Sequence, residues 1–131
     1  MFKQSAEAAE NETAALAALL ISGSLKIYSG TRPASTAGAI TGTLLATIPF
    51  DATPWTAGTV DGVYTQADTP ITVTAAATGT ATHARAWKAD GTTAVFDVDA
   101  STTGTEVILA STSIVAATNV TLTGMTITFA Q

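Results

Sequence analysis

Residues 82–101 read THARAWKADGTTAVFDVDAS, and this stretch indicates a β-hairpin. The segment KADGT (88–92) fits a three-residue loop with Gly91 in the left-handed conformation that glycine adopts without steric cost. β-Branched and aromatic residues follow the turn, as they do in strands. The sequence therefore predicts two antiparallel strands joined by residues 89–91.

The length of this loop determines the register of the hairpin. With residues 89–91 in the turn, Ala84 lies opposite Phe96 and His83 lies opposite Asp97. A two-residue loop would move every side chain of one strand to the other face and mix aspartates with core residues. The first register is therefore preferred, because it separates the residue types. One face is then apolar, and the other carries His83, Arg85, Trp87, Val95, Asp97 and Asp99.

We interpret the polar face as a structural feature. Arg85 lies diagonal to Asp97, within reach of an ion pair, and cross-strand pairs on a solvated face contribute roughly 0.2–1 kcal/mol each. One histidine with two aspartates is short of a zinc ligand set, and no calcium-loop pattern surrounds these acids. No serine stands in a nucleophile motif such as Gly-x-Ser-x-Gly. We therefore expect a solvated face without enzyme activity, metal or cofactor.

Outward from the hairpin, other short segments alternate between apolar and polar residues. SLKIYSG (24–30) and ITGTLLATIPF (40–50) read as strands, and the segment 31–39 between them reads as a loop because it lacks any period. NVTLTGMTITFA (119–130) alternates apolar residues with threonines. Its phase slips by one residue at Gly124, as a β-bulge requires.

Residues 51–70 (DATPWTAGTVDGVYTQADTP) form a long irregular stretch. Its prolines and glycines argue against a regular strand, and connections of such length are often functional. Trp55 and Tyr64 are either buried pins of this segment or an exposed contact patch. The second interpretation makes both of them candidate partner-binding residues.

The composition of residues 3–22 predicts the single helix, because alanine, glutamate and leucine favour helices. Ser5 is the expected N-cap and Gly23 the expected stop. The composition changes at Gly23, which divides the chain into an N-terminal helical arm (1–23) and a β-sandwich domain (24–131). The helix either docks on its own domain or packs against a neighbouring subunit. In the second case its partner-binding candidates are Phe2, Leu16, Leu19 and Leu20.

About six to eight short strands, with turn signals about every ten residues, indicate an all-β fold. We predict an antiparallel β-sandwich, Ig-like or jelly-roll-like, with one N-terminal α-helix, although a short closed barrel fits the same pattern. The 131 residues suffice for a hydrophobic core, and the absence of cysteine excludes disulfides.

Charge and hydropathy exclude several classes of partner. The net charge is −5, and the five Lys and Arg residues are scattered, whereas nucleic acid binding needs clustered cations. No apolar run reaches the ~20 residues of a membrane span. The run TAALAALLIS (13–22) follows acidic residues, whereas a secretory signal has basic ones there. We therefore expect no nucleic acid, no membrane contact and no export by that route.

Four segments, taken in order, resemble a family of small structural proteins of tailed bacteriophages. They are LKIYSGTRPAS (25–35), TGTLLATIPF (41–50), GTATHARAWKADGTTAVFDVDAS (79–101) and ILASTSIVAATNVTLTGMTITF (108–129). The order of the segments carries this resemblance, which covers most of residues 24–129, and no single motif is chemically specific.

The resemblance implies a non-enzymatic virion component. We expect a capsid decoration or cement protein that stabilises the head by binding between major capsid subunits, assembles in the host cytoplasm and is localised to the capsid. Such proteins are homo-oligomers, and a trimer is the expected state. The alternatives are a tail or head–tail connector component and an Ig-like adhesive module that binds glycans or cell surfaces.

Overall fold

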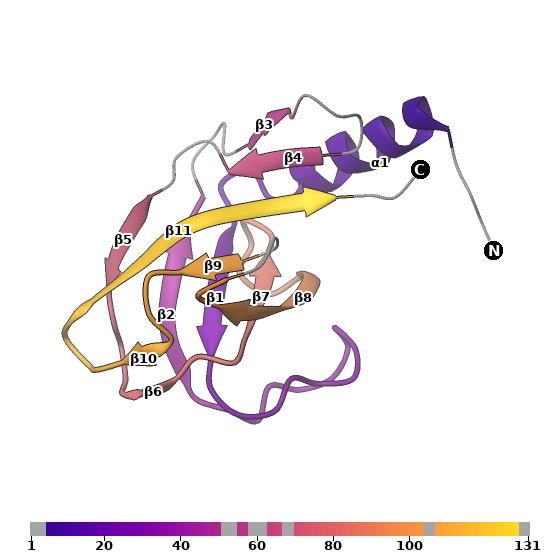
Figure 1. The fold of residues 1–131 in the computed structure, drawn as a ribbon. Coiled ribbons are helices and arrows are strands. Elements are labelled where there is room, and N and C mark those ends of the chain that lie inside the picture. The colour runs from indigo at the N-terminus through magenta and orange to yellow at the C-terminus, as the bar shows by residue number, and fades with distance from the viewer. Residues whose placement is uncertain (1–4, 51–54, 58–62, 67–69, 104–106, 129–131) are drawn as a thin grey trace.

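A computed structural model describes residues 5–50, 55–57, 63–66, 70–103 and 107–128. The chain is mostly β-strand with one N-terminal helix, which confirms the all-β class (Figure 1). The elements are α1 (Ala6–Leu19), β1 (Ser24–Tyr28), β2 (Leu44–Pro49), β3 (Trp55–Ala57), β4 (Val63–Gln66), β5 (Ile71–Thr74), β6 (Gly79–Thr80), β7 (His83–Trp87), β8 (Ala94–Ser101), β9 (Val107–Leu109), β10 (Ser113–Ile114) and β11 (Asn119–Thr128).

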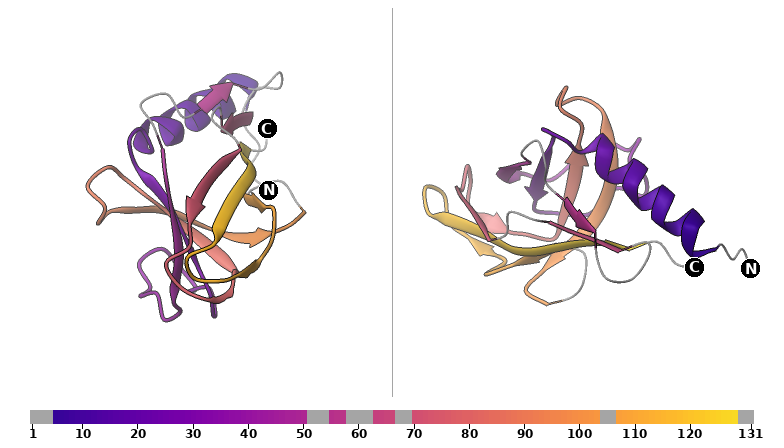
Figure 2. Two further views of the ribbon diagram at one scale, coloured as in Figure 1. Left: turned by 90° about the vertical axis from the view of Figure 1, so that its left-hand side faces the viewer. Right: turned by 90° about the horizontal axis from the view of Figure 1, so that it is seen from above.

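The helix follows the predicted N-cap at Ser5 but ends at Leu19, three residues before the predicted end at residue 22. The Oγ of Ser5 accepts a hydrogen bond from the backbone N–H of Ala8 at 3.1 Å, which confirms Ser5 as the N-cap. After α1 the N–H of Gly23 donates to the carbonyl of Leu20 at 2.9 Å, and the chain enters β1. Leu20 is fully buried in the core and Leu16 packs against it. The apolar end of the helix therefore lies on its own chain, at the end of the molecule where β4 lies (Figure 2).

Nine strands form the main sheet, in the order β2-β1-β7-β8-β9-β11-β4-β3 with β5 paired to β11. The end of β5 also approaches β2, because the N–H of Ala76 donates to the carbonyl of Leu45 at 2.7 Å. Seven strands, β2-β1-β7-β8-β9-β11-β5, thereby form a nearly closed sheet. β6 and β10 form a separate two-stranded sheet.

Two expectations about the strands need correction. The prediction of a wholly antiparallel sheet is wrong at one pair. β8 pairs with β7 as far as Asp99, which lies opposite His83, and its last residues, Ala100 and Ser101, pair with β9 in parallel. The prediction that residues 51–70 contain no regular strand is also wrong. β3 and β4 lie in this segment and pair with each other, and β4 pairs with the long strand β11. Pairing with β11 is a tertiary contact that local composition does not reveal.

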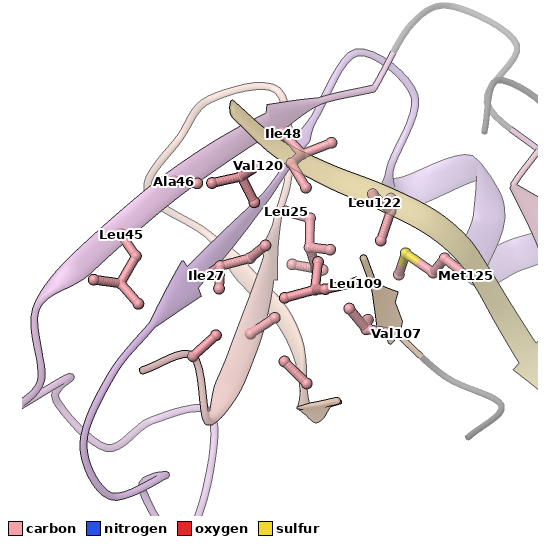
Figure 3. Packing of buried hydrophobic residues seen from close by; sticks show 14 of the residues in the cluster. Leu25, Ile27, Leu45, Ala46, Ile48, Val107, Leu109, Val120, Leu122 and Met125 are labelled. Carbon is pink, nitrogen blue, oxygen red and sulfur yellow. The ribbon is translucent and has the colours of Figure 1, made fainter. Parts of the chain in front are cut away.

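The hydrophobic core lies between β1 and β2 on one side and β9 and β11 on the other (Figure 3). Leu25 and Ile27 of β1 face Leu109 and Leu122 there, and all four side chains are fully buried. Burying a side chain of this size contributes about 1.5–3 kcal/mol. The bulge predicted at Gly124 is confirmed, since the register of β11 against β9 shifts between Leu122 and Gly124. The shift lets the core residues on both sides of the bulge face inward.

Candidate functional site

The predicted hairpin exists, but its register differs from the expected one. β7 and β8 pair antiparallel with Arg85 opposite Asp97, and Gly91 has φ +74°, as predicted for a left-handed turn residue. The turn is one residue longer than predicted, because the N–H of Lys88 bonds to the carbonyl of Thr93 at 3.0 Å. A bulge between Ala86 and Trp87 shifts the register by a further residue, so the observed pairing differs from the predicted pairing by two residues. Two one-residue changes leave residues 83–86 and 96–99 on their predicted faces, whereas beyond the bulge Trp87 lies opposite Ala94, which was predicted on the other face.

Asp90 accounts for the longer turn. Its Oδ1 accepts hydrogen bonds from the N–H groups of Thr92 and Thr93, both at 2.9 Å, and its Oδ2 accepts one from the Thr93 hydroxyl at 2.6 Å. The Thr93 hydroxyl, followed by the two backbone donors, lowers the pKa of Asp90 to about 2. These bonds favour the ionised carboxylate, so the turn is closed while Asp90 is charged.

We expect acid to loosen this turn only at low pH. The folded pKa of Asp90 is about 2 and its ordinary value is 3.8, so the stabilisation is complete above the ordinary value and is lost as pH falls between the two. An NMR titration of the Asp90 carboxyl should give a midpoint near the lower value. Thr93→Val should raise that midpoint, whereas Thr92→Val, which keeps the backbone donor, should not. A midpoint near 4 in the native protein would show that the turn bonds do not form in solution.

The centre of the polar face is buried, so the expectation of a solvated face is wrong at His83, Arg85 and Asp97, whereas Asp99 is exposed. The side chains of Arg85 and Asp97 are 4% and 8% exposed, and their bond is bidentate, with Nε to Oδ1 at 2.6 Å and Nη2 to Oδ2 at 2.9 Å. His83 is fully buried. Two elements cover this face. β1 pairs with β7 and places Tyr28 beside His83, and the loop 29–43 between β1 and β2 folds over Arg85.

Arg85 holds the loop 29–43 by its backbone. Its Nη1 donates to the carbonyl of Gly38 at 2.9 Å and its Nη2 to the carbonyl of Ser35 at 3.2 Å. The bond to Asp97 raises the pKa of Arg85, so the guanidinium stays charged. The Trp87 ring lies 5.8 Å from the guanidinium carbon. One cation therefore joins β7, β8 and the middle of the loop.

The two ends of the loop 29–43 are hydrogen-bonded to each other, independently of Arg85. The N–H of Ser29 donates to the carbonyl of Thr43 at 3.0 Å, and the N–H of Thr43 donates to the Ser29 hydroxyl at 3.2 Å. Gly30 has φ +84°, and a Cβ on Gly42 would lie 1.7 Å from the carbonyl oxygen of Ser29. Both glycines are therefore required by the close approach of the two ends of the loop.

His83 is held on two sides. Its ring stacks on Tyr28, with centroids 5.5 Å apart and planes at 19°. Its Nδ1 lies 3.1 Å from the Thr82 hydroxyl, which donates its proton to the carbonyl of Gly30 at 2.5 Å. Because that proton is used, we assign the imidazole proton to Nδ1. Nε2 is then a buried acceptor without a hydrogen-bond partner among the described residues.

Burial lowers the pKa of His83 below its ordinary value of 6.5, and the charge of Asp97 opposes this shift. The ring is therefore neutral at neutral pH. The Trp87 Nε1 is also buried without a hydrogen-bond partner among the described residues. Burial raises the pKa of Tyr28, and an interaction of its hydroxyl with Trp87 opposes that shift.

A shallow cavity of about 260 Å³ separates the loop from β8. Its lining residues are Arg32, Pro33, Ala34, Ser35, Thr36, Val95, Phe96 and Asp97. Arg32 forms an exposed ion pair with Asp99 at 3.4 Å. The carboxylate of Asp97 is occupied by Arg85, so it is not available as a general base for the Ser35 or Thr36 hydroxyl. Within residues 5–103 and 107–128, as far as they are described, no group of acids and His83 could hold a metal ion.

The residues predicted to contact a partner lie in different places. Leu19 is 44% exposed at the end of α1, whereas Leu20 is fully buried in the core and its side chain is closed to a partner in this conformation. Leu16 is partly buried against the core. Trp55 of β3 lies opposite Gln66 of β4, and Tyr64 of β4 lies opposite Ile127 of β11. Phe2 lies outside the described residues.

The buried anchor of the loop 29–43 was missed by the sequence reasoning. Its donors are on β7 and its acceptors are backbone carbonyls, which no side-chain pattern reports. The only local signal is the pair Gly30 and Gly42 at the two ends of the loop. None of the helices in the described part of the chain has the length and apolar character to cross a membrane. Comparison with models of known protein families, with curated proteins and with solved structures finds no match.

Proposed function

We propose that the protein is a non-enzymatic component of a tailed-phage virion, and that it decorates the capsid by binding between major capsid subunits. It would assemble in the host cytoplasm as a homo-oligomer, with a trimer as the expected state. The ordered resemblance of residues 24–129 to small phage structural proteins supports this proposal. We further propose that the nearly closed sheet is a β-sandwich, with β2-β1-β7-β8 as one layer and β9-β11-β5 as the other.

The observation that carries the proposal is that the buried pair of Arg85 and Asp97 binds the loop 29–43 and is closed to a substrate. An enzyme keeps a base or nucleophile accessible to its substrate. Here the carboxylate of Asp97, the acid that lines the cavity, accepts two hydrogen bonds from Arg85, and the guanidinium also donates to two loop carbonyls. The product of these bonds is a fixed loop on the surface, and a loop that is ordered before binding avoids part of the entropic cost of association. This arrangement suits a protein that acts by contact.

The end of the helix offers a second contact surface. Leu19 and Ile21 are 44% and 45% exposed, and they lie two residues apart next to the buried Leu20. Exposed apolar side chains at one place are typical of interaction sites. Val115 is 53% exposed but lies after β10, remote in sequence from α1. It therefore serves as a matched control.

Copy number is the decisive measurement. Quantification of this protein against the major capsid protein in purified particles should give on the order of hundreds of copies, as a lattice position requires. A dozen or fewer copies would contradict decoration and support a connector or tail position. Absence from particles would contradict the virion role altogether, and binding of the free protein to glycans or cells would then identify the adhesive alternative.

A binding assay tests the helix surface. Purified Leu19→Ser protein, added to capsids that lack the protein, should occupy them at least about tenfold more weakly than the native chain. Val115→Ser should bind as the native chain does. Native protein should also raise the temperature at which capsids rupture. Equal binding by both variants would exclude the end of α1 from the interface while leaving the copy-number test unaffected.

A further inference from the structure

His83 lies at the point where the loop 29–43 leaves the sheet. It is the only histidine of the chain, and its side chain is fully buried. The ring stacks on Tyr28, the last residue of β1. Its Nδ1 contacts the hydroxyl of Thr82, and that hydroxyl holds the carbonyl of Gly30. Through the Thr82 hydroxyl, the imidazole therefore contacts the first residues of the loop 29–43.

This support depends on the ring being neutral. Nε2 is buried and has no hydrogen-bond partner among the described residues. An unpaired neutral acceptor in that position costs less than a protonated ring would, because the protonated ring buries a positive charge and an unused N–H donor. The charged and titratable groups that face the ring are Tyr28 on β1, Arg32 in the loop, Arg85 on β7, and Asp97 and Asp99 on β8. Two of these groups are cations, and Asp97 is already occupied by Arg85.

Asp99 is the remaining acid. It lies directly opposite His83 in the register of β7 and β8, and its side chain is 76% exposed. Its present partner is Arg32, 3.4 Å away and 45% exposed, so this ion pair is weak. A protonated ring that turned toward Asp99 would leave the Thr82 hydroxyl and displace Arg32. Both changes release residues at the start of the loop.

We propose that His83 is a proton-operated latch for the loop 29–43. The neutral ring holds the loop against the sheet through Thr82 and Gly30. One proton from solvent, taken up at Nε2, turns the ring toward Asp99 and frees the segment 30–32. The latch is a property of the folded chain alone and is independent of the proposed capsid role.

The direction of the pH dependence follows from burial. The closed state holds His83 with a pKa below 6.5, and the open state returns the ring to its ordinary value. The open state therefore binds the proton more readily, so the loop is closed above about pH 6.5 and opens as pH falls below it. For one proton, the opening equilibrium changes by up to about tenfold per pH unit.

Amide hydrogen exchange measured by NMR on the full chain tests the latch. The reporters are the amides of Ser29 and Thr43, whose hydrogen bonds close the base of the loop, and the amide of Ala110, bonded to Thr121 at 3.0 Å, is the core reference. After correction for intrinsic exchange, protection of the two loop amides should fall several-fold between pH 7.5 and 5.0, up to the limit of about thirtyfold that uptake of one proton at an ordinary histidine sets. Protection of Ala110 should stay constant.

Two variants separate the latch from a general effect of acid. His83→Phe keeps the stacking partner of Tyr28 but cannot titrate, so its loop protection should not change with pH. Thr82→Val keeps the shape of the side chain but removes the bridging hydroxyl, so its loop should already exchange fast at pH 7.5. Loop protection that is constant with pH in the native chain, or that falls equally in His83→Phe, overturns the proposal. A parallel loss at Ala110 also overturns it, because acid would then act on the whole fold.

The native protein provides a test that needs no variant. Because the chain has one histidine, its ring signals are unique, and their titration midpoint is read directly. The midpoint should lie below 6.5 and coincide with the midpoint of the loss of loop protection. A ring that titrates while Ser29 and Thr43 stay protected would overturn the latch even if both variants fail to fold.

Discussion

Arg85→Ala should lower the free energy of unfolding by about 3–5 kcal/mol, which is several times the effect of breaking an exposed pair. The substitution leaves the carboxylate of Asp97, 8% exposed, without its cation. It also removes the donors for the carbonyls of Ser35 and Gly38. A single domain has only about 5–15 kcal/mol of stability, so the variant should be marginally folded. Urea denaturation of both proteins, followed by circular dichroism, measures the difference.

The matched control replaces both partners. Arg85→Leu combined with Asp97→Leu removes both charges, and buried pairs replaced by apolar residues often keep or gain stability. The double variant should therefore be more stable than Arg85→Ala, although its loop 29–43 lacks the anchor and should be cut faster by proteases. A loss of 1 kcal/mol or less in Arg85→Ala would show that the pair is solvated in solution, as the sequence alone had led us to expect.

Gly42→Ala should destabilise the protein by about 3 kcal/mol, at the upper end of the range for overpacked positions. The added Cβ would lie 1.7 Å from the carbonyl oxygen of Ser29 and 2.7 Å from its carbon. These are backbone atoms, which cannot turn aside as a flexible side chain can. The substitution must therefore separate the two ends of the loop 29–43. Thermal unfolding of the variant and the native chain at one pH measures the loss.

Gly124→Ala is the control for this prediction. A Cβ at Gly124 would meet only the Cδ1 of Ile108, at 3.7 Å, which is an ordinary contact. Its effect should stay below about 1 kcal/mol, because no atom has to move. If Gly42→Ala were as mild as Gly124→Ala, the ends of the loop would not be in contact in solution, and the fixed loop of the proposed function would be lost with them.

The hairpin 82–101 shows how far a pattern of residue types reaches. The alternation of apolar and polar residues predicts the two strands, and Gly91 predicts the turn. The register was wrong by two residues, yet residues 83–86 and 96–99 lie on their predicted faces, because strands have a period of two. The capping bonds of Asp90 added one of those residues. Such bonds depend on turn geometry that a count of loop residues does not capture.

The N-cap at Ser5, the all-β class and the bulge at Gly124 were also determined by the sequence itself, because each depends on neighbouring residues or on a local period. Burial of the polar face was decided only by the tertiary structure. Whether Arg85 is exposed depends on the loop 29–43, whose nearest acceptor to it is 47 residues away along the chain. A period along one strand states which side chains share a face. Only the fold decides what covers that face. Here the loop 29–43 covers it, so the pair of Arg85 and Asp97 is buried and holds the loop.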